Sequence, residues 1–105
     1  MITKKQIDIL ADTIAKKFST KKIFLFGSYA YGKPESESDL DICIIIELGN
    51  KRKIELIRDI RREINLYFQI PIDILLYDNK EFNERSIHPT TLEYKILKQG
   101  ILING

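Results

Sequence analysis

Residues 23–46 read IFLFGSYAYGKPESESDLDICIII, and this stretch decides the fold. Two apolar runs of the kind that forms buried strands flank a polar connector rich in serine, glycine and proline. The turn Gly27-Ser28 follows the first run directly, and Asp39 and Asp41 stand at the start of the second. Because side chains alternate faces along a strand, these two carboxylates are expected to project from the same side.

The bulk properties are those of one soluble globular domain spanning residues 1–105. The chain has 105 residues, 44% hydrophobic and 30% charged, with a formal net charge of only +2. Basic and acidic residues are interspersed, which disfavours direct nucleic acid binding. The single cysteine, Cys43, lies in an apolar strand pattern and indicates a buried thiol in a reducing compartment. No membrane segment is expected, and the predicted location is cytoplasmic.

Hydrophobic periodicity predicts three longer helices and three strands, with a short helix over residues 29–31. A Thr3-to-Gln6 capping box opens the first long helix, Asn50 is the expected cap of the second, and a Thr90-to-Glu93 capping box is expected before the third. The helices are predicted over residues 4–18, 50–68 and 91–99, and the strands over residues 22–26, 40–47 and 70–77.

The second helix is expected to turn a set of mostly apolar residues inward: Ile54, Ile57, Ile60 or Arg61, Ile64 and Tyr67. Residues 101–103 form either a short edge strand or a packed tail. This order predicts an α/β fold of the α+β type, in which a small mixed β-sheet is flanked by helices, on one face.

Asp73 interrupts the third apolar run, Ile72 to Leu76, with a lone carboxylate. A buried ion pair with an arginine is one interpretation, since an unpaired buried carboxylate is costly. The favoured interpretation places the third strand beside the second, so that Asp73 joins Asp39 and Asp41 in a metal site. Mg²⁺ would then lie between carboxylates that otherwise repel one another, and Asp73 could accept a proton from an attacking hydroxyl.

Gly27 and Ser28 are predicted to bind phosphate. Glycine allows close approach of the backbone, the amides of a following helix point at an anion, and the serine adds a hydroxyl donor. A Gly-Ser pair alone carries no information. Its position between an apolar strand and the paired aspartates gives the prediction its weight.

The pattern Gly27-Ser28, ten residues, Asp39-x-Asp41 and a later strand Asp73 resembles the DNA polymerase beta-like nucleotidyltransferase superfamily. Across nearly the whole chain it is most similar to the minimal nucleotidyltransferase (MNT) antitoxin branch. The resemblance implies transfer of a nucleoside monophosphate, commonly AMP from ATP, to a hydroxyl of a protein partner. It also implies two Mg²⁺ ions, with Mn²⁺ as the alternative, and a HEPN-domain toxin as that partner.

One position departs from this family, because many members carry arginine where this chain has Tyr31. If that arginine holds phosphate, Lys33 is the nearest substitute in the sequence. The alternative function is a catalytically inactive antitoxin that neutralises its HEPN toxin by binding alone.

Overall fold

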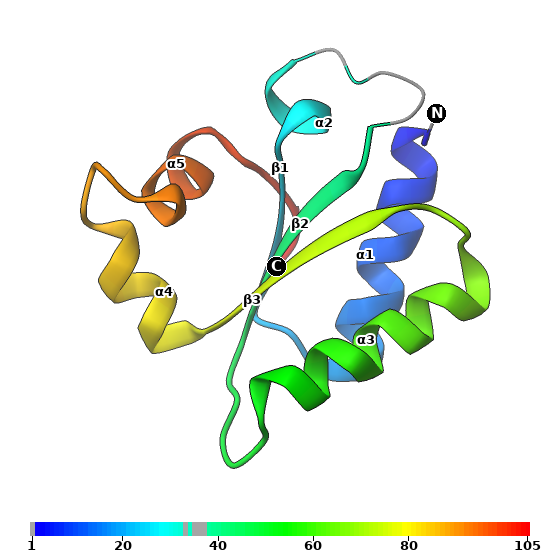
Figure 1. Ribbon diagram of the computed structural model, residues 1–105, viewed down its shortest axis with the longest axis horizontal. Helices are drawn as coiled ribbons and strands as arrows, with labels where there is room; N and C mark the ends of the chain where they lie inside the picture. The colour runs from blue at the N-terminus through cyan, green and yellow to red at the C-terminus, as the bar shows by residue number, and fades with distance from the viewer. Residues whose placement is uncertain (1, 33, 35–37) are drawn as a thin grey trace.

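The structure is a computed structural model that describes residues 2–32, 34 and 38–105. Figure 1 shows the sheet in the middle of the molecule, with helices on both sides and the short helix α2 above one end. In chain order the elements are α1 (Lys4–Phe18), β1 (Lys22–Phe26), α2 (Ser28–Tyr31), β2 (Leu40–Ile46), α3 (Lys53–Tyr67), β3 (Ile72–Asp78), α4 (Asn79–Ser86), α5 (Leu92–Gln99) and β4 (Ile101–Asn104).

The strands form a mixed sheet in the order β3-β2-β1-β4. β1 pairs antiparallel with both β2 and β4, whereas β2 and β3 are parallel. Parallel neighbours need a long crossover, and α3 provides it between β2 and β3. The predicted α/β class and the mixed sheet are therefore confirmed, and residues 101–104 form the edge strand β4.

Helices cover both faces of the sheet, so the expectation of helices on one face is wrong. On one face α1 and α3 pack over the alternate β2 residues Ile42 and Ile44. On the other face Cys43 belongs to a second cluster with Phe82 of α4 and Ile96 of α5. The physical reason is visible in β2, where five consecutive buried apolar residues leave no face for water.

Three local predictions need correction. α3 begins after Arg52, which makes no side-chain capping bond, and not after an Asn50 cap. Its buried stripe runs through Leu56, Ile60 and Ile64, while Ile54 and Tyr67, both expected to face inward, are 60% and 66% exposed. The cap of α5 is Thr91, whose hydroxyl accepts from the Tyr94 amide, and not Thr90.

The capping box before α1 is confirmed, with reciprocal bonds between Thr3 and Gln6. Cys43 is fully buried, and burial raises the pKa of its thiol to about 12, with the nearby Glu93 carboxylate adding to the shift. Among the described residues, no helix is long and apolar enough to cross a lipid bilayer.

Candidate active site

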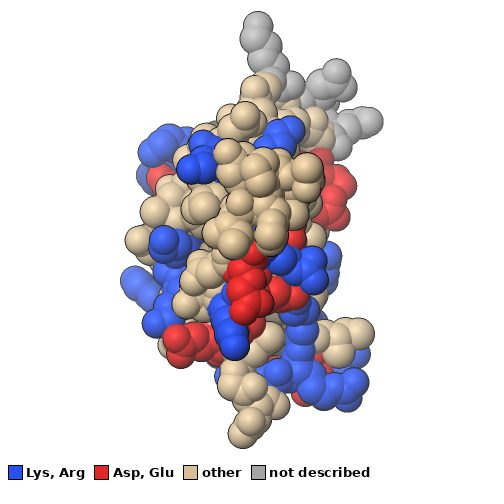
Figure 2. Space-filling model, turned by 90° about the vertical axis from the view of Figure 1, so that its left-hand side faces the viewer, with Lys and Arg blue, Asp and Glu red and all other residues tan. Residues whose placement is uncertain are grey.

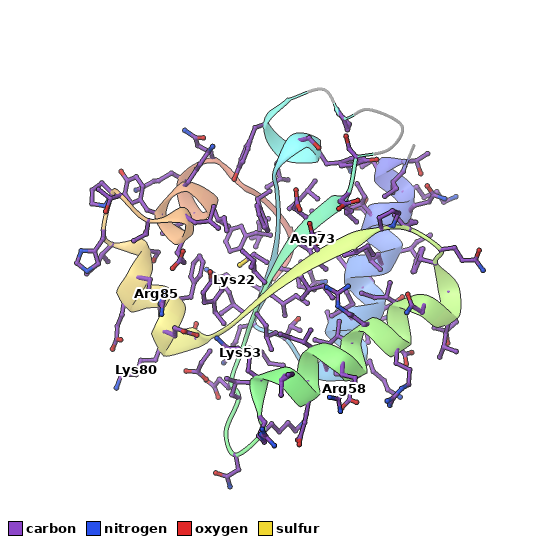
Figure 3. All side chains as sticks on the ribbon, in the orientation of Figure 1. Lys22, Lys53, Arg58, Asp73, Lys80 and Arg85 are labelled. Atoms are coloured by element: carbon purple, nitrogen blue, oxygen red, sulfur yellow. The ribbon has the colours of Figure 1, made fainter. Side chains whose placement is uncertain are left out.

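The carboxylates of Asp41 and Asp73 lie side by side on neighbouring strands. Asp41 is the register partner of Asp73 in the parallel β2–β3 pair, and Figure 3 shows Asp73 where β3 runs beside β2. Register partners of a parallel pair project from the same face. Asp41 shares this face with Cys43, two residues further on, so it is the face that α4 and α5 cover. The prediction that the third strand lies beside the second is confirmed.

The surroundings of Asp41 raise the pKa of its carboxyl group. Partial burial, the charge of Asp73, a hydrogen bond between the two carboxyl groups and the charge of Asp39 all raise the pKa of Asp41 above its ordinary value. Asp39 immediately precedes β2 and is exposed. Like charges held this close favour either a shared proton or a bound cation.

The donor set fits Mg²⁺ in its chemistry, since carboxylate oxygens are the ligands that this ion prefers. Within residues 2–32, 34 and 38–105, however, no three His, Cys, Asp or Glu side chains gather closely enough to form a metal site. The structure thus brings Asp41 and Asp73 together as a pair. Asp39 is close enough to influence Asp41 but does not complete a three-carboxylate cluster.

Gly27 lies directly against Asp41, and only glycine fits there. Its φ of 72° and ψ of −154° belong to a backbone region that other residues rarely adopt. A Cβ at this position would stand 2.9 Å from Cγ of Asp41 and would overlap the carboxylate itself. The Gly27 carbonyl accepts from the amides of Ala30 and Tyr31, which sets Ser28 as the first residue of α2. The Gly-Ser turn and the carboxylates are therefore adjacent in space.

Asp73 is exposed, which contradicts the interpretation of a buried ion pair with an arginine. An arginine does bind the neighbouring residue: the Arg61 guanidinium donates a hydrogen bond to the backbone carbonyl of Ile72 at 2.9 Å. Within the described part of the chain, no ion pair satisfies Asp73. Its carboxylate is left to face Asp41 and the solvent.

The sequence profile of a nucleotidyltransferase domain family matches residues 7–102, which is most of the chain. The chain belongs to this family. It is a nucleotidyltransferase.

Two proteins of Methanocaldococcus jannaschii (strain ATCC 43067) are close enough in sequence to support the assignment. "Putative protein adenylyltransferase MJ1305" is 36% identical over 70 residues, which are 64% of this chain and 48% of that protein. "Putative protein adenylyltransferase MJ0604" is 33% identical over 76 residues, 70% of this chain and 72% of that protein. The chain thus aligns with about half the length of the first relative.

Solved structures show the same fold at low sequence identity. A "putative nucleotidyltransferase" from Sulfolobus solfataricus has a TM-score of 0.59 and 17% identity, over 93% of this chain and 76% of that one. A toxin-antitoxin with AMP-PNP has a TM-score of 0.59 and 20% identity, over 93% and 73%. A mutant of the toxin-antitoxin MntA-HpeT has a TM-score of 0.57 and 19% identity, over 100% and 74%.

Tyr31 is the last residue of α2 and is bonded through its amide to the carbonyl of Gly27. Burial, and to a lesser degree the charges of Cys43 and Asp41, raise the pKa of the Tyr31 hydroxyl. The ammonium of Lys95, on α5, lies 4.8 Å from the centre of the Tyr31 ring. Sequence reasoning missed Lys95, because an exposed lysine on a distant helix carries no local signal. Lys33, the nearest candidate substitute in the sequence, lies outside the described residues.

Proposed function

We propose that the chain transfers a nucleoside monophosphate, AMP from ATP, to a hydroxyl of a partner protein. The observation that carries the proposal is the facing pair Asp41 and Asp73 set directly against the Gly27-Ser28 turn. This places carboxylates suited to a metal next to backbone suited to a polyphosphate. The names of the two Methanocaldococcus jannaschii relatives, each a "putative protein adenylyltransferase", support a protein as acceptor.

Asp39, Asp41 and Asp73 are the residues that would hold the two Mg²⁺ ions, with Mn²⁺ as the alternative. When bound, the metal supplies charge neutralisation to the phosphate oxygens and to the leaving pyrophosphate. Gly27 and Ser28 bind the triphosphate through backbone amides and the serine hydroxyl. Asp39 contributes as an exposed ligand at the mouth of the site.

Asp73 is placed to act as the general base, since it is the exposed member of the pair. The acceptor oxygen forms a bond to the α-phosphorus, and the bond from that phosphorus to the β-phosphate oxygen breaks. The acceptor proton moves to Asp73, and pyrophosphate leaves. Asp41, more buried and flanked by Asp73, stays as a ligand and orients the site.

The partner that we propose is a HEPN-domain toxin, with this chain as its antitoxin in the cytosol. Support comes from the resemblance to the minimal nucleotidyltransferase branch and from the two toxin-antitoxin structures that share the fold. On the side of the molecule that carries α4 and α5, basic and acidic side chains are interspersed (Figure 2), without the one-sided positive surface of a nucleic acid binder.

The test is transfer of label from ATP to a co-expressed HEPN-domain protein, with the label at either the α- or the γ-phosphate. The proposal requires that the α-label appears on the partner, that the γ-label does not, and that Asp41→Asn abolishes transfer. Partner neutralisation by both the wild type and Asp41→Asn, without any transfer, would instead establish the catalytically inactive antitoxin that acts by binding.

A further inference from the structure

Helix α5 lies over the same face of the sheet as the active-site carboxylates. Its residue Ile96 is fully buried in the cluster that contains Cys43. Cys43 and Asp41 alternate along β2 and therefore share a face. Ile96 thus packs α5 onto the sheet in the cluster that contains Cys43, which lies two residues after Asp41 in β2. Lys95, the neighbour of Ile96, is exposed, and its ammonium lies 4.8 Å from the centre of the Tyr31 ring.

Tyr31 connects this lysine to the phosphate-binding turn. It is the last residue of α2, and its amide donates to the Gly27 carbonyl at 2.9 Å. Tyr31 is 37% exposed, and Gly27, to which it is bonded, lies directly against Asp41. Tyr31 therefore links the Gly27-Ser28 turn to α5: its amide is bonded to Gly27, and the ammonium of Lys95 lies against its ring.

The charge balance of the site calls for a cation at this rim. Asp41 and Asp73 form an acidic pair with Asp39 close to Asp41, and the proposed substrate, a triphosphate, is itself strongly anionic. Two cations on this side of the sheet are paired, Lys53 with Glu81 at 2.8 Å and Arg85 with Glu81 and Glu93. Among the residues that the structure describes, no carboxylate pairs with Lys80 of α4 or with Lys95 and Lys98 of α5, and of these three lysines it is Lys95 that lies over the Tyr31 ring.

We propose that Lys95 is a phosphate-binding residue that contacts the β- and γ-phosphates of the nucleoside triphosphate, and that Tyr31 is a positioning residue that holds its ammonium toward the site. The inference rests on the proposed function, since it assigns a further ligand to the same substrate. Lysine is a compact charge with three donors on a flexible stem, which suits the changing geometry of a departing pyrophosphate. Cation–π contact with the ring keeps that stem from sampling all its rotamers.

A matched control lies on the same helix. Lys98 is also exposed and also stands over a ring, 5.7 Å from the centre of Tyr94, which does not take part in the Gly27 turn. Lys95→Met and Lys98→Met each remove one charge and one cation–π contact from α5 and keep the aliphatic stem. A difference between them in nucleotide affinity therefore reports the position of the charge and not the loss of a surface lysine.

The experiment is calorimetric titration of ATP, and of inorganic triphosphate as a probe without a base, in the presence of Mg²⁺. Lys95→Met should weaken both by roughly tenfold to a hundredfold, the range of a charged hydrogen bond, and Lys98→Met by less than about twofold. Lys95→Arg should recover most of the affinity. Tyr31→Phe should bind like the wild type, while Tyr31→Leu should lose several-fold with a normal melting temperature.

Suppose that the wild type binds ATP and Asp41→Asn does not. Equal ATP affinities of Lys95→Met and Lys98→Met would then overturn this inference and leave the proposed function standing. Loss of ATP affinity in Lys95→Met with unchanged triphosphate affinity would also overturn it, because the lysine would then read the nucleoside. Absence of binding by the wild type would overturn the proposed function together with the inference.

Discussion

Replacing Gly27 by alanine should both destabilise the fold and displace Asp41. The backbone at Gly27 has φ 72° and ψ −154°, where a residue with a side chain costs about 1–3 kcal/mol. The new Cβ would also stand 2.9 Å from Cγ of Asp41 and overlap its carboxylate. Forcing an extra methyl group into a packed contact costs typically a further ~1–3 kcal/mol.

A small term acts in the opposite direction, since alanine restricts the unfolded chain by about 0.4–1 kcal/mol relative to glycine. The net loss of unfolding free energy for Gly27→Ala is therefore roughly 1–5.5 kcal/mol. For a domain of this size each kcal/mol lowers the melting temperature by about 4–8 °C. Urea unfolding gives the free energy, and the transfer assay gives the activity, which should fall with the displaced carboxylate.

Gly49 provides the control. It also has a positive φ, 59°, but a Cβ there meets nothing within 4 Å. Left-handed backbone alone costs roughly 1–2 kcal/mol, largely offset in the unfolded state, so Gly49→Ala should lose at most about 1.5 kcal/mol and keep full activity.

Combining Gly27→Ala with Asp41→Ala removes the overlapping carboxylate and leaves the strained backbone. The double variant should therefore be less destabilised than the sum of the two single variants. Equal stability and activity of Gly27→Ala and Gly49→Ala, or strict additivity with Asp41→Ala, would refute the close contact on which the reasoning depends.

Three further predictions concern charge, packing and metal. The pKa of Asp41 in the folded state is raised, chiefly by burial and by the charge of Asp73, so the folded state binds this proton more tightly than the unfolded state. The fold therefore loses stability as the pH rises from the ordinary carboxyl pKa through the raised pKa of Asp41. Asp41→Asn should therefore stabilise the fold at neutral pH by roughly 0.2–1 kcal/mol while abolishing transfer; urea titrations at neutral and acidic pH check this, and a less stable variant at neutral pH would contradict it. Replacing Ile60, which is 0% exposed, by alanine should lower the free energy of unfolding by about 2–5 kcal/mol. Ile54→Ala, at a 60% exposed position of the same helix, should change it by no more than about 0.5 kcal/mol. Similar urea midpoints for the two variants would contradict the buried face assigned to α3. Chelation by EDTA should abolish transfer without lowering the melting temperature, and added Mg²⁺ should restore it; activity that survives chelation would exclude a metal-dependent reaction.

The strands that carry the site could be predicted because their signal is local. The apolar runs around Gly27 and Asp41 are strong, and Asp73 stands out because it interrupts a third run. Alternation predicts that Asp39 and Asp41 share one side of the second strand, and the helical crossover between the parallel strands brings β3 alongside, so that Asp41 pairs with Asp73. None of these steps needs a contact between distant side chains.

The second helical layer could not be predicted with the same ease. α4 has the sequence NKEFNERS, in which Phe82 is the only large apolar residue, so its amphipathic pattern is weak. Phe82 is nevertheless 2% exposed, in a stacked contact with Phe24 at 6.0 Å between ring centres. The uninterrupted apolar run of β2 does indicate that a second layer of helices is needed, because neither face of such a strand can be left in water.

Positions set by tertiary packing were the hardest to predict. The Tyr31–Lys95 contact joins residues far apart in the chain, and neither residue interrupts a local pattern. On α3, apolar residues occur around more than one side of the helix, so periodicity alone did not identify which of them face the sheet.

The most direct test of the central claim is a crystal structure of the protein with Mn²⁺ and a non-hydrolysable ATP analogue, with anomalous scattering used to locate the ions. The account predicts anomalous density between the carboxylates of Asp41 and Asp73, with the triphosphate against the Gly27-Ser28 turn. A nucleotide bound elsewhere, for example in the groove formed by Ile9, Thr13 and Tyr67 between α1 and α3, with no ion at the paired carboxylates, would contradict it.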